Sequence, residues 1–219
     1  MSAVLKFSPK AVKPRLSDRT AAQFLRLPAL DQVQILHDQK FPKLAPQVFK
    51  QPYYHSARHG IREIIGNGQA GLVEARGRLQ KIGQPSRRMH NMRAVEQFWQ
   101  SEHPSRGLKL TTQKRYRTEL SGVELRMSPD LFAYEGDEER FIYFNFKAEK
   151  FDPEVARMTL EIAHWLLEEN GIKVKPSQLE FIDLFTGVLY RGKKPRIKTI
   201  KLLKDNAKLI ESLWPSIDP

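Results

Sequence analysis

Hydrophobic positions in residues 1–100 recur at helical spacing, and the runs end at proline and glycine. The pattern predicts five helices. Ser17 and Asp18 give the first helix an N-cap, and Gly66-Asn67-Gly68 ends the third. The predicted helices run from Ser17 to Leu27, from just after Pro28, from about Tyr53 to Ile65, from Leu72 to Ile82 and from Met89 to Gln100.

The hydrophobic period changes after Pro104 from helical to alternating, which indicates β-strands. Three strands are predicted, joined by a turn at Ser121-Gly122 and by an acidic turn from Glu135 to Glu139. The strands run from Leu108 to Leu120, from Val123 through Asp130 to Tyr134, and from Phe141 to Ala148.

A capped helix follows these strands. Asp152 is its predicted N-cap, Pro153 takes the first helical position, and Asn170-Gly171 ends it. A hairpin with its turn at Thr186-Gly187 and a last helix complete the pattern. These final elements run from Leu179 to Phe185, from Val188 to Arg191 and from about Ile200 to Trp214.

This order of elements predicts an α/β fold with a mixed central sheet flanked by helices and a helical N-terminal region. Residues 1–16 contain two prolines and four basic residues, and we interpret them as a basic N-terminal arm. Residues 17–88 are predicted to form a helical region packed on the core. Residues 89–219 are predicted to form the α/β core with a basic C-terminal segment.

The chain of 219 residues carries a formal net charge of +12, which favours an anionic partner, nucleic acid before a membrane surface. The charge is uneven. Residues 1–120 hold 22 Lys and Arg against 8 Asp and Glu, residues 121–184 hold 7 against 14, and residues 185–219 hold 8 against 3. An acidic centre between basic flanks suits a cation site beside a phosphate track. The alternative is that the acids lie on solvated turns and on a helix face.

The chain contains no cysteine, which excludes disulfides, thiolate zinc sites and iron–sulfur clusters. That composition agrees with a reducing compartment. No apolar stretch has the length of a membrane span, and the N-terminus lacks the apolar segment of a signal peptide. We therefore expect a cytoplasmic protein without a membrane partner.

Asp130 and the strand that leads to Lys147 carry the candidate chemistry. Side chains alternate along a strand, so Asn145, Lys147 and Glu149 share one face, while the positions between them face the core. Antiparallel pairing with the preceding strand would bring Asp130 beside them. Such a set suits Mg²⁺ or Mn²⁺, with Asp130 as chief ligand and Asn145 as a neutral carbonyl ligand. The second carboxylate would come from Glu149, or from Glu96 and Glu119 upstream. Lys147 would then stabilise charge on an attacked phosphate.

The order of motifs from Glu119 to Lys147 resembles a family of nucleases. The motifs are Glu119, Gly122, Ser128-Pro129-Asp130 and Asn145-Phe146-Lys147, and they resemble the PD-(D/E)xK, or restriction-endonuclease-like, superfamily over residues 90–190. The predicted order helix–strand–strand–strand–helix–strand also fits, and the part after the lysine is most similar to the RecB-type branch. The resemblance implies a restriction-endonuclease-like core, metal-dependent hydrolysis of DNA, and a catalytic set of Asp130, Asn145 and Lys147.

The resemblance also implies helper residues. Glu96 or Glu119 would supply a further acid, Arg157 is the polar residue near the start of the helix after the lysine, and His59 is the candidate for an upstream histidine typical of the RecB-type branch. The chain departs from the pattern at Asn145, where most members have a carboxylate. A neutral side chain there weakens metal binding, so either the activity is lost or the acid has moved to Glu149.

Two basic clusters are candidates for contacts with phosphates. One surrounds Tyr116, and the other follows Tyr190 and is short of acids. The candidate nucleic-acid-binding residues are Arg115, Arg117, Arg191, Lys193, Lys194, Arg196 and Lys198.

The sequence therefore leaves three functions open. The first is a metal-dependent nuclease that hydrolyses phosphodiester bonds in DNA. The second is a catalytically inactive protein with a nuclease-like fold that binds nucleic acid, with DNA favoured over RNA. The third is an interaction subunit with a protein partner in a larger DNA-processing, mobile-element or defence complex.

Overall fold

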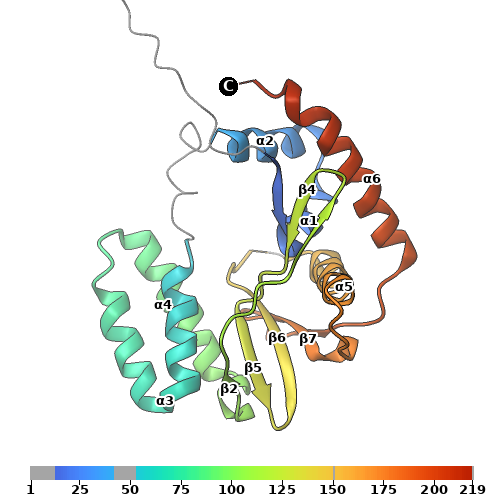
Figure 1. Ribbon diagram of the computed structural model, residues 1–219. Helices are drawn as coiled ribbons and strands as arrows, with labels where there is room; N and C mark the ends of the chain where they lie inside the picture. The colour runs from blue at the N-terminus through green and yellow to red at the C-terminus, as the bar shows by residue number, and fades with distance from the viewer. Residues whose placement is uncertain (1–12, 42–52, 150, 219) are drawn as a thin grey trace, which may run out of the picture.

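A mixed five-stranded sheet forms the centre of the computed structural model, which describes residues 13–41, 53–149 and 151–218 (Figure 1). Its strand order is β2–β5–β6–β7–β8. β6 and β7 are parallel, with helix α5 (Pro153–Glu169) between them in the chain, and the other neighbouring pairs are antiparallel. The strands are β2 (Lys109–Leu110), β5 (Leu131–Glu135), β6 (Glu138–Asn145), β7 (Leu179–Asp183) and β8 (Leu189–Arg191). The predicted α/β fold with a mixed sheet flanked by helices is confirmed.

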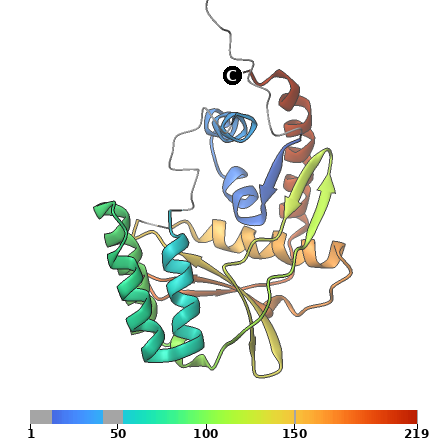
Figure 2. The ribbon, with the colours of Figure 1, turned by 60° about the vertical axis from the view of Figure 1, so that its left-hand side comes forward.

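Both faces of this sheet are buried, because alternate side chains of each central strand enter two different hydrophobic clusters. In β6, Phe141 and Tyr143 pack with α5, whereas Ile142 and Phe144 pack with α3 and α4. Figure 2 shows the two helical layers on either side of the sheet. The sequence pattern identified only the second of these faces as core. The face with Phe141 and Tyr143 is also covered by helices. Because β6 ends at Asn145, Lys147 and Glu149 do not lie on a face of the strand but in the exposed segment that follows it.

The layer that contacts Ile142 and Phe144 is a bundle of antiparallel helical segments. Helix α3 (His55–Gln80) reverses at Gly68, where φ is 56° and ψ is −129°, and α4 (Pro85–Gln100) follows it. The reversal brings Arg78 into a salt bridge with Glu63. It also places Gly71 so close to the Glu63 carbonyl that a Cβ atom at Gly71 would lie 2.1 Å from that oxygen. The predicted break between two helices near Gly66–Gly68 is thus confirmed.

The opposite layer combines α5 with α1 (Asp18–Phe24), α6 (Ile197–Leu213) and a small sheet. The small sheet has the order β1–β4–β3, where β1 is Arg15–Ser17, β3 is Arg117–Leu120 and β4 is Val123–Arg126. Helix α2 (Ala29–Lys40) lies against the C-terminal region, where Lys40 Nζ donates hydrogen bonds to the carbonyl oxygens of Trp214 and Ile217, each at 2.7 Å. Two short 3₁₀ helices, His103–Arg106 and Pro176–Gln178, precede β2 and β7, and a third, Trp214–Ser216, follows α6.

Two strand predictions are wrong in the same way. The segment from Leu108 to Leu120 forms two short strands, β2 and β3, that belong to different sheets, and the segment from Val123 to Tyr134 likewise divides into β4 and β5. Pro129 lies at the second break, where it cannot donate to a strand ladder. The break brings Asp130 to the junction between the two sheets.

The predicted capped helices are present. The Ser17 side chain accepts a hydrogen bond from the Thr20 N–H at the start of α1, and the Asp152 side chain accepts one from the Glu154 N–H at the start of α5. Residues 1–12 of the predicted basic arm lie outside the described residues, and residues 15–17 form β1. Among the described residues, no helix combines the length and the hydropathy needed to cross a membrane.

Candidate functional site

Asp130 is completely buried at the start of β5. Its backbone N–H donates to the Ile142 carbonyl at 2.8 Å, and its carboxylate Oδ2 accepts a hydrogen bond from the Phe144 N–H at 2.7 Å. The carboxylate is therefore fixed against β6, as the sequence predicted from antiparallel pairing.

Two arginines hold the same carboxylate. Arg19 Nη2, from α1, lies 2.5 Å from Asp130 Oδ2, and Arg58 Nε, from the first turn of α3, lies 2.6 Å from Oδ1. The side chains of Arg19 and Arg58 are 23% and 32% exposed, whereas that of Asp130 is 0% exposed. We call Asp130, Arg19 and Arg58 the arginine clamp. Through the clamp, a helix from each of the two helical layers, α1 and α3, contacts the same buried carboxylate.

Aromatic rings support the Arg19 side of the clamp. The Arg19 guanidinium lies 5.5 Å from the ring centroid of Tyr143 and 5.4 Å from that of Phe181, distances typical of cation–π contacts. Burial opposes the charge on Arg19, but the neighbouring Asp130 carboxylate outweighs it and raises the pKa of the guanidinium. Arg19 therefore stays cationic in a largely apolar setting.

A second buried acid, Asp18, lies next to the clamp. It accepts hydrogen bonds from the Tyr143 hydroxyl, from the Arg19 N–H at 2.8 Å and from the Ser128 N–H at 3.3 Å. Burial raises the pKa of Asp18 to about 6, although these hydrogen bonds oppose the shift. Burial and the adjacent Asp18 also raise the pKa of Tyr143 well above its ordinary value. Asp18 thus titrates in a range where an exposed aspartate is already ionised.

Asn145 is committed to protein contacts. Its Nδ2 donates to the Lys147 carbonyl at 2.9 Å and to Asp183 Oδ1 at 3.1 Å, and its Oδ1 accepts the Lys147 N–H at 3.1 Å. The amide therefore organises the chain as it leaves β6 and bridges to the end of β7. Its carbonyl oxygen, the atom expected to bind a metal, already has a backbone partner.

These residues do not fit Mg²⁺ or Mn²⁺. A hard divalent cation needs oxygen ligands with free lone pairs and a net negative cage. Here two guanidinium groups face the Asp130 carboxylate, and Asn145 contributes no charge. Among residues 13–41, 53–149 and 151–218, no group of three or more His, Cys, Asp or Glu side chains is arranged to hold a metal ion.

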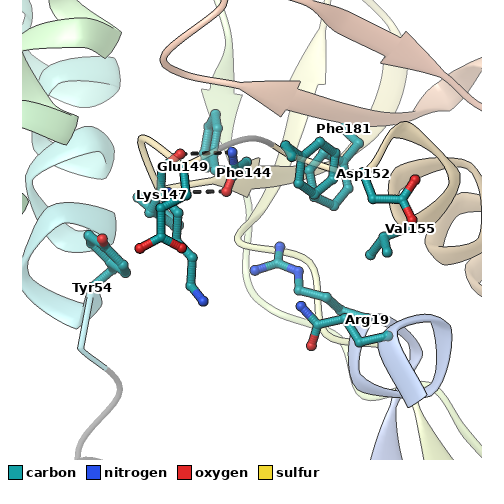
Figure 3. A pocket seen from close by; sticks show the side chains of 12 residues that line it. Arg19, Tyr54, Phe144, Lys147, Glu149, Asp152, Val155 and Phe181 are labelled. Atoms are coloured by element: carbon teal, nitrogen blue, oxygen red, sulfur yellow. Dashed lines mark hydrogen bonds between the residues drawn. The ribbon is translucent and has the colours of Figure 1, made fainter. Parts of the chain in front are cut away.

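A pocket of about 300 Å³ opens beside the clamp. Figure 3 shows the Arg19 guanidinium and the Lys147 side chain directed into it, with Tyr54 on one side and Val155 on the other. Glu149 and Asp152 also line it, so the described residues contribute two cations and two acids to it. Asp130 is not among the lining residues, whereas its partner Arg19 is.

The structure does not bring the predicted helpers into this pocket. Each candidate has its own partner elsewhere, and none of them lines the cavity among the described residues. Glu96 forms two hydrogen bonds with Arg76 within the helical bundle, Glu119 pairs with Lys13 beside the small sheet, His59 contacts Arg78 and Glu63, and Arg157 pairs with Glu154 and Glu161 along α5.

The candidate nucleic-acid-binding residues occupy two surfaces. Arg115 and Arg117 are both exposed; Arg115 lies just before β3 and Arg117 is its first residue. The other five are exposed between the end of β8 and the first turn of α6, and we call this set the β8–α6 basic segment; it comprises Arg191, Lys193, Lys194, Arg196 and Lys198. Arg196 also pairs with Glu161 at 3.1 Å and Glu154 at 3.4 Å, which anchors the segment to α5.

The residues that sequence reasoning missed are Arg19, Arg58, Asp18 and Asp183. Asp18 carried a signal, because it stands at the start of a predicted helix, but nothing local marked it as buried. Arg19 meets Asp130 across a separation of 111 residues. A contact over such a separation produces no periodic pattern in a single sequence, so it could not be predicted from the pattern of residues.

The chain matches no family model, and no curated protein or solved structure is similar enough to it to count as a match. Its functional interpretation therefore rests on its own residues and their geometry.

Proposed function

We propose that this protein binds nucleic acid through a nuclease-like core and does not cleave it. The observation that carries the proposal is the arginine clamp, in which Arg19 and Arg58 supply the positive charge that a divalent cation would bring to Asp130. A carboxylate that is buried and paired twice is a poor ligand for a further cation, because the cation would have to displace a guanidinium.

The topology supports the nuclease-like part of the proposal. Helix α4 precedes three antiparallel strands, β2, β5 and β6, and helix α5 then leads to β7, which is parallel to β6. This is the order helix–strand–strand–strand–helix–strand that the resemblance to the PD-(D/E)xK superfamily implies. The small hairpin of β3 and β4 is inserted between the first two strands of the set.

Charge supports the nucleic-acid part. The net charge of +12 favours a polyanion, and the β8–α6 basic segment presents exposed cations on a continuous stretch of chain. In the described residues, Lys193, Lys194 and Lys198 form no salt bridge, so their charges are available to phosphates. A nucleic-acid partner and a chain without cysteine also suit a cytoplasmic protein.

Binding of fluorescently labelled DNA, measured by anisotropy at several salt concentrations, tests the proposal. We expect binding that weakens with salt and does not depend on Mg²⁺ or Mn²⁺, since the clamp needs no metal. Binding that requires a divalent metal would contradict the proposal, and so would the lack of any binding at low salt.

A second candidate function is metal-dependent cleavage of DNA, and the exposed Lys147 and Glu149 in the pocket favour it. In this alternative, DNA binding would displace Arg19 and free Asp130 for the metal. Cleavage in Mg²⁺ or Mn²⁺ that is lost in both Asp130→Ala and Lys147→Ala would support it. Equal activity in those two variants and the wild type would exclude it.

A protein partner is a further proposal. Leu30 of α2 and Ile197 of α6 are 82% and 87% exposed, which is unusual for large apolar side chains and suits a contact surface. Retention of a specific partner by the full chain, and loss of that partner in Leu30→Glu or Ile197→Glu, would support a role in a larger complex.

A further inference from the structure

A second hollow lies on the other side of the first turn of α5. It has a volume of about 360 Å³, within the range of small-ligand sites. Asp152 and Val155 line the pocket beside the clamp, whereas Pro153 and Glu154 line this one. Its other lining residues are Arg157 and Leu160 of α5 and the four residues from Tyr190 to Lys193. The β8–α6 basic segment therefore starts at its rim.

The apolar part of this hollow contains the aromatic ring of Tyr190. Tyr190 is half-buried, and its ring centroid lies 6.2 Å from that of Phe151, which in turn stacks on Phe181 at 5.0 Å. The fully buried Leu160 completes the apolar lining. Burial also raises the pKa of Tyr190, so its hydroxyl remains a neutral hydrogen-bond donor.

The rim of the hollow is positively charged. Arg191 is 66% exposed, Lys193 is exposed, and Arg157 also lines the site. Among the described lining residues Glu154 is the only acid, and both Arg157 and Arg196 pair with it. The surplus of cations favours an anionic ligand at this site.

Gly192 holds the rim in place. Its N–H donates to the Leu179 carbonyl at 2.8 Å, and a Cβ atom at this position would lie 2.2 Å from the Pro176 carbonyl oxygen. The backbone between Arg191 and Lys193 is therefore pressed against the chain that leads into β7. Side chains on either side of Gly192 start from a fixed position, which suits a preformed binding site.

We infer that this hollow binds a base of single-stranded DNA, stacked on Tyr190, with the neighbouring phosphates on Arg191, Lys193 and Lys194. The inference rests on the proposed function and adds the form of the nucleic acid. Aromatic rings combined with a cationic track are typical of single-strand binding, because every base has a face that can stack. In a duplex those faces are covered by neighbouring bases, so a duplex can reach only the rim.

The test compares a labelled oligothymidylate of about 15 nucleotides with a duplex of the same length, by anisotropy at low salt. Tyr190→Leu removes the ring but keeps an apolar side chain, and Tyr190→Phe keeps the ring. Lys193→Glu reverses a charge at the rim. Its matched control is Lys173→Glu, which makes the same charge change at an exposed lysine that does not line the hollow.

Single-stranded DNA should bind more tightly than the duplex to the wild type. Tyr190→Leu should weaken single-strand binding about tenfold, equivalent to about 1.4 kcal/mol, and leave duplex binding unchanged. Tyr190→Phe and Lys173→Glu should stay near the wild type, and Lys193→Glu should weaken binding to both ligands.

Equal binding of the two ligands, with no effect of Tyr190→Leu on either, would overturn the inference while leaving the proposed function intact. Full competition by free thymidine monophosphate at micromolar concentration would also overturn it, since the hollow would then be a mononucleotide site. If the wild type binds neither ligand, the proposed function fails, and the inference fails with it.

Discussion

Arg58 Nε lies 2.6 Å from Oδ1 of Asp130, and this contact joins a helix on one face of the sheet to a carboxylate that Arg19 approaches from the other layer. Asp130, the acid that most resembles a nuclease metal ligand, therefore has a structural role, because it connects helices from the two faces of the sheet. The two guanidinium groups already neutralise its charge, so a divalent cation bound there would add uncompensated positive charge.

Asp130→Asn should destabilise the protein strongly. Asparagine keeps the shape of the side chain but leaves Arg19 and Arg58 without their counter-charge in a half-buried setting. Breaking a buried ion pair by removing one partner costs about 3 kcal/mol. Urea unfolding should show a loss of this order in the free energy of unfolding.

The control for this variant is Glu119→Gln, which removes the partner of Lys13 in an exposed ion pair whose side chains are 58% and 40% exposed. That change should cost less than about 1 kcal/mol. Wild-type stability or better in Asp130→Asn would contradict the structural role of Asp130 and would favour a functional one.

Asp18 should make the stability depend on pH between about 4 and 6. Because burial raises its pKa from 3.8 to about 6, the folded protein keeps a proton in this range that the unfolded chain has already released. The contribution of Asp18 is fully present below pH 4 and is lost as the pH rises through about 6. The shift corresponds to a free energy on the order of 3 kcal/mol.

Asp18→Asn provides the comparison, since it retains hydrogen-bonding atoms but does not titrate. The free energy of unfolding, measured in urea from pH 4 to pH 7, should fall more steeply in the wild type than in the variant. Parallel curves for the two proteins would show that Asp18 has an ordinary pKa.

Two glycines in α3 should respond in opposite directions to alanine. At Gly71, a Cβ atom would lie 2.1 Å from the Glu63 carbonyl oxygen, so Gly71→Ala should separate the antiparallel halves of α3 at a cost of about 2 kcal/mol. At Gly77, no atom lies within 4 Å of the added Cβ, so Gly77→Ala should stabilise the helix by about 0.5–1 kcal/mol. Thermal unfolding of both variants tests this, and equal effects would argue against the reversal at Gly68.

DNA binding should show the salt dependence of a few phosphate contacts. The logarithm of the binding constant should fall linearly with the logarithm of the salt concentration, with a slope of about 0.7 to 0.9 for each contact. Lys194→Glu and Lys198→Glu should each lower the magnitude of this slope, whereas Lys173→Glu should not. A slope that none of the three substitutions changes would place the interface away from the β8–α6 basic segment.

Local signals in the sequence were sufficient for most of the fold. The N-caps Ser17 and Asp152, the turns at Ser121-Gly122 and Gly187, and the break at Gly68 all follow from the chemistry of one or two residues, and the structure has each of them. The alternation along β6 indicated a strand, but periodicity alone did not show that helices cover both of its faces.

The candidate site was less predictable because its decisive contacts are long-range. Asp130 was found from its motif, and its place beside β6 was expected. Its partners Arg19 and Arg58 come from helices that are distant in the sequence. Nothing in a single sequence distinguishes an arginine that pairs with a buried carboxylate from one that is exposed to solvent. The departure at Asn145 was the only local sign that the usual metal chemistry is altered.

Calorimetric titration of Mn²⁺ into the wild-type protein tests the central claim most directly. The arginine clamp predicts no binding heat up to millimolar metal, and the same result for Asp130→Ala, because Arg19 and Arg58 already neutralise the carboxylate. A variant that combines Arg19→Gln, Arg58→Gln and Asn145→Asp serves as the positive control and should gain a site for Mn²⁺. One Mn²⁺ bound per wild-type chain at micromolar affinity, and lost in Asp130→Ala, would contradict the account.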